Sequence, residues 1–274
     1  MPINWVELNI IDENKEMINE YVEIANYYDN LLTSRHLQKR FSNPCPTVLK
    51  LAFLERSSGY FDFDYFSNIL YNLLGARRKV LDIGVGTGLL AEKMLSLANY
   101  KIVGVDFSPR MLEIAKKRLA ISDVKLICQD MTEFETEEKF EAIVSTGGVI
   151  AAVEEEGEYR IYSHITDPEK NKHLLAKLHS QLDDGGLLAL AIHGPHNNYK
   201  KEIKDEIFYE QKIKKEGNYM DKWYVFSQAN GEVLNEQFCR FYFFDGRQTT
   251  QALIDAGFQQ EYQIIDGKFL VSYK

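Results

Sequence analysis

The segment Val80-Leu81-Asp82-Ile83-Gly84-Val85-Gly86-Thr87-Gly88 decides the fold of this chain. Its apolar start belongs to a predicted strand, Lys79–Ile83, and the residues after the last glycine predict a helix, Leu89–Leu97. Glycines let the backbone approach a bound molecule without obstruction by a Cβ atom. A helix start offers free N–H groups and the positive end of the helix dipole. The segment therefore predicts a ligand site at the carboxyl end of a strand.

Strands and helices alternate after this segment. The alternation predicts an α/β fold, a doubly wound and mostly parallel sheet with helices on both faces, for which we expect seven strands. A helix over Pro168–Leu182 is expected to begin with Asp167 as its N-cap and to end before Gly185-Gly186. The other predicted elements are strands at Lys101–Val105, Val124–Cys128, Phe140–Val144 and Leu187–Ile192, and a helix at Pro109–Leu119.

The two ends of the chain have different patterns. Residues 1–75 predict an N-terminal helical lid, and residues 76–274 a second domain that holds the glycine-containing segment. Within that domain, period-two alternation and an Asn-Gly turn predict accessory antiparallel strands at about 205–244 that lead into the last strands of the sheet. The individual expectations are helices near 12–36, 47–56, 63–75 and Thr249–Ala256, and strands at Glu206–Lys214, Lys222–Gln228, Val233–Phe244 and Lys268–Tyr273.

Composition excludes several classes of protein. The 274 residues carry a formal net charge of -9, which disfavours nucleic acid and anionic membranes as partners, because both require a basic face. No apolar stretch is long enough to span a bilayer, and the first residues lack a signal-peptide pattern. Three widely spaced cysteines predict reduced thiols and no zinc site. We expect a cytoplasmic monomer or homodimer.

Acidic side chains are placed at the ends of three successive predicted strands. Asp82 belongs to the glycine-containing segment, Asp106 ends the next strand, and Asp130 follows the third. A carboxylate at the glycine loop repels an anionic pyrophosphate and favours a ligand with positive charge. Asp106 has the position of a carboxylate that accepts both hydroxyls of a ribose. Asp130 is placed to accept a hydrogen bond from an adenine amino group.

The sequence resembles the class I methyltransferases that depend on S-adenosylmethionine (SAM). The resemblance covers roughly residues 76–193 and implies that SAM is the cofactor and S-adenosylhomocysteine the product. Relatives that methylate amino groups of DNA or of protein glutamine carry an Asn/Asp-Pro-Pro-aromatic run after the fourth strand. This chain has Ser145-Thr146-Gly147-Gly148 there, which points to a small-molecule acceptor. The runs that carry the resemblance are VLDIGVGTG (80–88), VDFSPRMLEIAKKR (105–118), ICQDM (127–131) and LDDGGLLALAI (182–192).

The resemblance also implies roles for single residues. Gly84 and Gly86 would pass beneath the methionine part of SAM, with Ser145 beside it. Asp106 would hold the ribose and Asp130 the edge of the adenine. An aromatic residue of the N-terminal lid would cover the sulfonium. The further candidates for contact with SAM are Asp82, Phe107, Met111, Met131, Tyr28 and Tyr60.

The acceptor is expected beyond the fourth and fifth strands, towards which the methyl group must point. The long segment Val149–Thr166 is predicted to be a loop over the carboxyl ends of the strands, with Tyr159, Tyr162 and His164 as substrate-binding candidates. The alternative is a solvated surface hairpin. His193 and His196 follow the fifth strand and are candidate general bases.

The predicted function is the transfer of a methyl group to a nitrogen or oxygen atom of a small molecule by in-line displacement. The protein mainly aligns donor and acceptor and excludes water, and no metal is expected. Two alternatives remain. One is a SAM-binding regulatory protein without turnover. The other is a nicotinamide oxidoreductase, which Asp82 and the missing Gly-x-Gly-x-x-Gly spacing disfavour.

Overall fold

The computed structural model describes residues 62–204 and 207–274. The predicted helices near 12–36 and 47–56 lie outside these residues, as do Tyr28 and Tyr60. The division at residue 75 between a lid and a second domain therefore stays a prediction.

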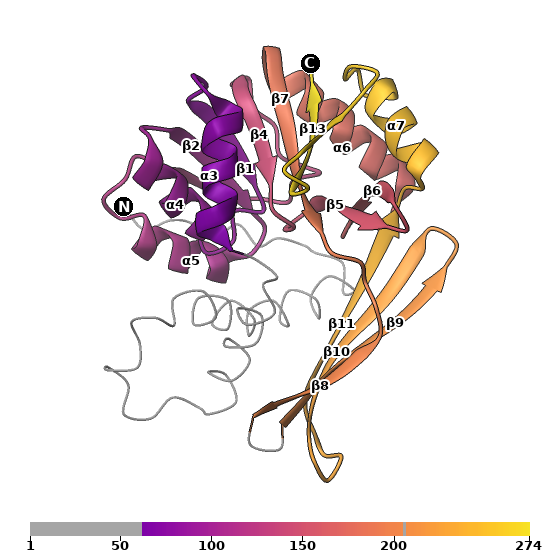
Figure 1. Cartoon of the computed structure of the whole chain (residues 1–274). Coiled ribbons are helices and arrows are strands. Elements are labelled where there is room, and N and C mark those ends of the chain that lie inside the picture. Colours follow the sequence, from indigo (N-terminus) through magenta and orange to yellow (C-terminus); the bar gives the residue numbers. More distant parts are fainter. Residues whose placement is uncertain (1–61, 205–206) are drawn as a thin grey trace.

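A parallel sheet forms the centre of the described chain, with strand order β3-β2-β1-β4-β7 (Figure 1). The chain runs outward from β1 to β3 and then returns to β4 on the other side of β1, so the topological switch point lies between β1 and β4. Ligands of such sheets bind at this point, at the carboxyl ends of the strands. The five strands are β1 (Lys79–Ile83), β2 (Lys101–Asp106), β3 (Lys125–Cys128), β4 (Phe140–Ser145) and β7 (Leu182–His193).

The far edge of this sheet is antiparallel. Strand β13 (Phe269–Tyr273) pairs with β7, and β12 (Gln263–Ile265) pairs with β13. The described residues form thirteen connected strands, so the expected count of seven is not confirmed. The mixed α/β architecture, mostly parallel at its centre, is confirmed.

Helices cover both faces of the sheet, as the alternating pattern predicts. Successive residues of β7 point to opposite faces, and so Leu187 and Leu188 belong to two different core clusters. One cluster packs the sheet against α3 (Phe63–Leu74), α4 (Leu89–Leu97) and α5 (Pro109–Arg118). The other packs it against α6 (Pro168–Gln181) and α7 (Gly246–Asp255).

The predicted start of α6 is confirmed and its predicted end is one residue too long. The Asp167 side chain accepts hydrogen bonds from Glu169 N–H and Lys170 N–H, which is the expected N-cap. The helix ends at Gln181, and β7 begins at the next residue. Gly185 and Gly186 therefore lie within β7, where the pairing with β4 shifts register.

The segment Val149–Thr166 is not the expected loop, and most of it forms a β-hairpin, which was the alternative; its strands are largely buried and not solvated. Strands β5 (Ile150–Glu155) and β6 (Glu158–Ser163) are joined by Glu156 and Gly157, whose φ angles are 56° and 80°. Two positive φ angles in a two-residue connection match the twist of a tight hairpin. Strand β5 also runs parallel to the end of β7, where Val153 pairs with His193. Since β5 is buried on both faces, it lacks the period-two signal of a surface strand.

Four long antiparallel strands form an extension arm that projects from the body of the molecule (Figure 1). The arm was predicted, but its connection was not: β11 pairs with β6, through Tyr242 and Ser163. Lys215 of the arm also forms an ion pair of 2.9 Å with the buried Glu155 of the hairpin. The strands are β8 (Tyr199–Lys204), β9 (Ile207–Glu216), β10 (Tyr219–Gln228) and β11 (Val233–Phe243).

Two findings bear on the expectations from composition. Within the described residues, Cys128 is a free thiol. No helix in that part of the chain has the length and apolarity required to cross a bilayer.

Candidate functional site

The glycine loop between β1 and α4 lies at the switch point of the sheet. Its backbone is held by hydrogen bonds of 2.8 and 3.1 Å from Gly84 N–H and Val85 N–H to the Val105 carbonyl oxygen. Gly84 has a φ of 72°, in the left-handed region that favours glycine. A Cβ atom on Gly84 would lie 2.6 Å from Cα of Gly148, which follows β4. The two glycines are therefore required for this close approach of β1 and β4.

Asp82 lies beneath the loop and is 2% exposed. Neither of its carboxylate oxygens has a hydrogen-bond partner within the described residues. Burial, and secondarily the charge of Asp106, raises the pKa of Asp82 from 3.8 to about 7. A buried carboxyl group without partners is costly to ionise, and a cation bound beside it would offset that cost.

Asp106 ends β2, and its side chain is organised by the backbone. Gly86 N–H donates to Oδ2 and Ser108 N–H donates to Oδ1, both at 2.8 Å. Burial raises the pKa of Asp106, and these two hydrogen bonds oppose that shift. Each carboxylate oxygen accepts more than one hydrogen bond, so this arrangement leaves lone pairs for two hydroxyls of a ligand.

The contacts of the two residues that follow β3, Asp130 and Met131, do not by themselves indicate a ligand. Asp130 is exposed, and its Oδ1 accepts from the backbone N–H and the hydroxyl of Thr132, each at 2.8 Å. Met131 is 3% exposed and packs in the core on the α6 side of the sheet. Contact of either residue with an adenine ring stays a prediction.

Three further predicted cofactor residues surround the loop. Phe107 is half-buried directly after Asp106, and Met111 is buried in the first turn of α5. Ser145 ends β4 and is fully buried, and its hydroxyl donates to the Ile150 carbonyl oxygen at 2.6 Å. That bond commits the Ser145 proton to β5, so only the lone pairs of the hydroxyl are left for a ligand.

Sequence reasoning missed two residues that shape the loop. Gly148 is one, although the Gly147-Gly148 pair was a visible signal. The other is Arg118, at the end of α5, whose guanidinium donates to the carbonyl oxygen and the hydroxyl of Thr87 at 2.6 and 2.8 Å. No local pattern marks this contact, because the two residues are far apart in the sequence.

A cluster of titratable side chains is formed by residues of β6, the end of β7, β10 and the segments that follow β6 and β7. We call this group the histidine cluster; its members are Tyr162, His164, His193, His196 and Lys222. The Nε2 atom of His193 lies 3.2 Å from the Thr146 carbonyl oxygen, and its Nδ1 atom is hydrogen-bonded to the Tyr162 hydroxyl. His164 bonds to the backbone of Gly147. The cluster thus contacts the same segment after β4 that closes the glycine loop.

The hydrogen bonds define the state of His193. A carbonyl oxygen only accepts, so Nε2 carries the proton and Nδ1 accepts from Tyr162. Burial is the main cause that lowers the pKa of His193 and of His164 to about 4, and the Lys222 ammonium adds to it. The same two causes, in that order, lower the pKa of His196 to about 2. These rings are therefore neutral near pH 7, and they are weaker bases than the sequence led us to expect.

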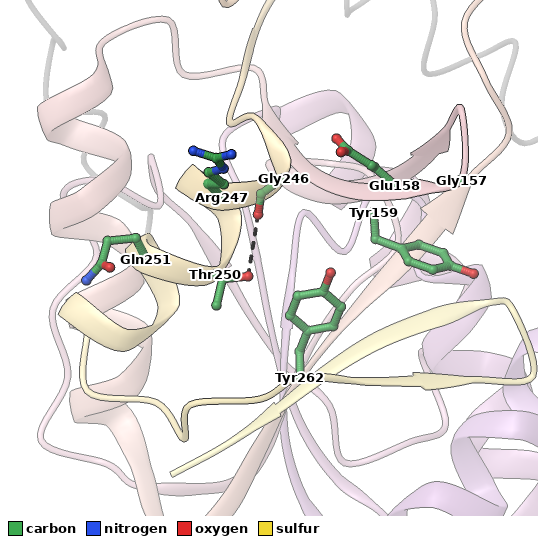
Figure 2. A pocket seen from close by; sticks show the side chains of 8 residues that line it. All are labelled: Gly157, Glu158, Tyr159, Gly246, Arg247, Thr250, Gln251 and Tyr262. Atoms are coloured by element: carbon green, nitrogen blue, oxygen red, sulfur yellow. Dashed lines mark hydrogen bonds between the residues drawn. The ribbon is translucent and has the colours of Figure 1, made fainter.

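The three predicted substrate-binding residues do not lie together. Tyr162 belongs to the apolar cluster that faces the extension arm, whereas Tyr159 packs on the opposite face of β6, towards α7. There Tyr159 and Tyr262 line an open cavity of about 520 Å³ between the hairpin turn and α7, shown in Figure 2. The residues lining this cavity include neither the glycine loop nor the histidine cluster. Tyr159 is thus separated from Tyr162 and His164.

The described residues contain no group of three or more His, Cys, Asp or Glu side chains arranged to hold a metal ion. They do fit SAM at the glycine loop. The unpartnered carboxyl group of Asp82 suits a cationic ligand, and the oriented carboxylate of Asp106 suits a ribose. The glycines of the loop carry no Cβ atom that would obstruct the approach of a ligand.

Comparison with known proteins agrees with this geometry. Residues 80–186 match the sequence model of a family described as methyltransferase domain. The malonyl-[acyl-carrier protein] O-methyltransferase of Priestia megaterium is 29% identical over 116 residues, which are 42% of this chain and 41% of that relative. The enzyme of the same description from Anoxybacillus flavithermus is 26% identical over 168 residues, 61% of this chain and 56% of the relative. The chain thus spans about half the length of these curated relatives.

A solved structure extends the likeness over most of the fold. SAM-bound CalS10, an amino pentose methyltransferase from Micromonospora echinaspora, superposes with a TM-score of 0.59 at 16% identity, covering 85% of this chain and 99% of that chain. At such identity the likeness shows the fold alone. The sheet and its glycine loop thus lie in a segment similar to a methyltransferase domain, and the described fold is that of a SAM-dependent methyltransferase of known structure.

The contact between Gly84 and Gly148 generates a testable prediction. In Gly148→Ala the new Cβ atom would lie 2.6 Å from Cα of Gly84 and displace the loop. We expect SAM binding to weaken by ~10-fold or more, since forcing a group into a packed site costs about 1–3 kcal/mol. Titration calorimetry measures the change. Gly194→Ala is the matched control, because its Cβ atom would have nothing within 4 Å, and unaltered binding by Gly148→Ala would contradict the prediction.

Proposed function

We propose that this protein transfers the methyl group of SAM to a nitrogen or oxygen atom of a small molecule. The observation that carries the proposal is the pair of buried carboxyl groups, Asp82 and Asp106, around a loop closed by the Gly84–Gly148 contact. The two curated relatives are named as O-methyltransferases of a protein-bound malonyl group, and CalS10 as a methyltransferase of an amino sugar. These names support methyl transfer, and they are compatible with either nitrogen or oxygen as the acceptor atom.

The chain's own groups would bind and align the reactants. When bound, SAM supplies a methyl group that is already electrophilic because of its positive sulfur. Asp106 would hold the ribose hydroxyls, and the ionised Asp82 carboxyl group would stabilise the positive charge of the ligand. Phe107, Met111 and Asp130 would border the adenine. Alignment of donor and acceptor with exclusion of water then accounts for most of the rate.

We propose that His193 positions Tyr162 and does not act as a general base. Both of its ring nitrogens are hydrogen-bonded within the protein, to Thr146 and Tyr162. With a pKa of about 4, its protonated form is also strongly disfavoured near neutral pH. The acceptor would therefore bind with its lone pair available, and the Tyr162 hydroxyl would help to orient it.

Binding of SAM and methyl transfer are tested separately. Calorimetry should show that SAM binds with a micromolar Kd, which corresponds to a binding free energy of roughly 8 kcal/mol in magnitude. Asp106→Ala should weaken it by ~10- to 100-fold, because each charge-assisted bond contributes about 1.5–3 kcal/mol. Asp184→Ala, at an exposed position of β7, is the control. A mass-spectrometric screen of amines, phenols and carboxylates then detects transfer. Wild-type affinity in Asp106→Ala would refute the ribose assignment, and tight binding without any turnover would indicate a regulatory SAM-binding protein.

The raised pKa of Asp82 predicts how affinity depends on pH. The free carboxyl group ionises as pH rises through about 7, and only the ionised form attracts a cation. SAM affinity should therefore rise up to that pH and level off above it, with a loss of ~10-fold for each pH unit below. The free protein should show the opposite trend: the contribution of Asp82 to the free energy of unfolding is present below pH 3.8 and lost as pH rises to about 7.

Asp82→Asn keeps the size of the side chain and removes its titration. Both profiles should become flatter in this variant, as measured by calorimetry and by urea unfolding. Profiles that match those of the parent protein would show that another group causes the dependence.

The positioning role of His193 is distinguished from a base by two variants. His193→Gln retains a donor and an acceptor for Thr146 and Tyr162, whereas His193→Ala retains neither. We expect His193→Gln to keep most of kcat and His193→Ala to lose much more, with SAM affinity unchanged in both. Removal of a general base costs ~100-fold or more. If both variants lost kcat equally and by that amount, His193 would be the general base.

A further inference from the structure

The last turn of helix α5 packs directly on the glycine loop. A Cβ atom on Gly88, the N-cap residue of α4, would lie 2.8 Å from Cδ1 of Leu119 and 3.2 Å from Cβ of Ala115. Thr87, the residue before Gly88, is 5% exposed. The loop and the end of α5 are therefore in close contact, and that contact is buried.

Arg118 ends α5, and its side chain extends into this contact. The side chain is 7% exposed, although arginine is seldom buried unless it is paired. Its Nη1 atom donates to the carbonyl oxygen and to the hydroxyl oxygen of Thr87, at 2.6 and 2.8 Å. Its Nε atom lies 3.5 Å from a carboxylate oxygen of Glu92, in the first turn of α4. The guanidinium thus joins the end of one helix to the start of another.

Fold stability alone does not explain a guanidinium at this place. The end of α5 favours a cation and the start of α4 disfavours one, so the two helix dipoles oppose each other here. A buried ion pair is often no more stabilising than a well-packed apolar side chain of similar size. What a guanidinium adds is direction, because its planar donors bind oxygen atoms in a fixed geometry.

The other end of α5 is bonded to the cofactor site. Its N-cap is Ser108, whose N–H group donates to Oδ1 of Asp106 at 2.8 Å. Oδ2 of the same carboxylate accepts from Gly86 N–H, also at 2.8 Å. These contacts form a closed ring, whose members in order are Asp106, Gly86, Thr87, Arg118 and Ser108. The orientation of the carboxylate therefore depends on where the guanidinium holds the loop.

We propose that Arg118 is a positioning residue for SAM. It holds the Thr87 peptide so that Gly86 N–H directs the Asp106 carboxylate towards the ribose hydroxyls. The inference rests on the proposed function, which assigns the ribose to Asp106. Arg118 acts through the loop and needs no contact with SAM. Loss of its guanidinium should therefore weaken the ribose contacts more than the rest of the cofactor site.

Two nucleosides measure the ribose contacts separately from the other contacts. They are S-adenosylhomocysteine and its 2′-deoxy form, which lacks one ribose hydroxyl, and titration calorimetry of the full chain gives the Kd of each. In the parent protein the 2′-deoxy form should bind ~10-fold or more weakly, because a hydrogen bond to a charged group is lost. In Arg118→Met the ratio of the two Kd values should fall by ~5-fold, the difference between a charge-assisted and an ordinary hydrogen bond.

The ratio distinguishes positioning from stability. A variant that is only less stable binds both ligands in its folded form and keeps the ratio, whatever its unfolding temperature. Lys117→Met is the matched control, because it removes the same charge from the same turn of α5 at an exposed position. In an Asp106→Ala background, which lacks the ribose carboxylate, Arg118→Met should leave the ratio unchanged, since the two residues act as one unit.

Arg118→Lys gives a second test, which replaces the first if Arg118→Met does not fold. Lysine retains the positive charge, but its nitrogen ends one bond short of the Nη1 position and lacks the planar fork. The ratio should therefore fall in this variant as well. Circular dichroism checks that each variant is folded.

An unchanged ratio in the folded Arg118 variants, or an equal fall in Lys117→Met, would overturn the inference. Equal binding of both ligands by the parent protein would also overturn it, because there would be no ribose contact for Arg118 to position. Neither result affects the proposed transfer of a methyl group. Absence of S-adenosylhomocysteine binding by the parent protein would instead refute the proposed function.

Discussion

The contact between Gly84 and Gly148 holds the carboxyl ends of β1 and β4 together, and the site depends on it. With any side chain at either position the two strand ends would move apart. The loop would then lose the position in which Gly86 N–H reaches Asp106. The segment after β4 would shift as well, and with it the carbonyl oxygen of Thr146 to which His193 is bonded. One backbone contact thus positions both the glycine loop and the segment to which the histidine cluster is bonded.

The histidine cluster is assembled from parts that lie far apart in the sequence. The hairpin supplies Tyr162, the end of β7 supplies His193, and the extension arm supplies Lys222. The Glu155–Lys215 ion pair joins the arm to the hairpin, together with a small apolar cluster that contains Met220. The arm is therefore more than an accessory surface, because its pairing with the hairpin places the buried Lys222 side chain beside His196.

The central α/β elements and the cofactor half were predictable because their signals are local. Apolar runs of five or six residues, helical periodicity and the Asp167 cap lie within single elements, and the structure places most of these within one or two residues of the predicted bounds. Asp82, Asp106 and the glycines share one short pattern. A parallel sheet brings the carboxyl ends of its strands to one edge, so the placement of these residues followed from the sequence.

The hairpin and the histidine cluster were not predictable in the same way. Strand β5 is buried on both faces and resembles a short apolar loop until its pairing with β7 is known. The alternation along β6 sends Tyr159 and Tyr162 to opposite faces, which follows only once the segment is recognised as a strand. The state of His193 depends on a carbonyl oxygen 47 residues away, and that of His196 on Lys222, 26 residues away. The positions of His193 and His196 after one strand suggested two general bases. Their hydrogen-bond partners in the structure suggest two positioning residues instead.

The net negative charge of the chain contrasts with the buried Lys222 side chain. A chain with a formal net charge of -9 does not attract anions over long distances, and salt screens fields between exposed groups beyond about 8 Å at physiological ionic strength. The Lys222 ammonium, 2% exposed, is screened far less and acts over a few ångströms.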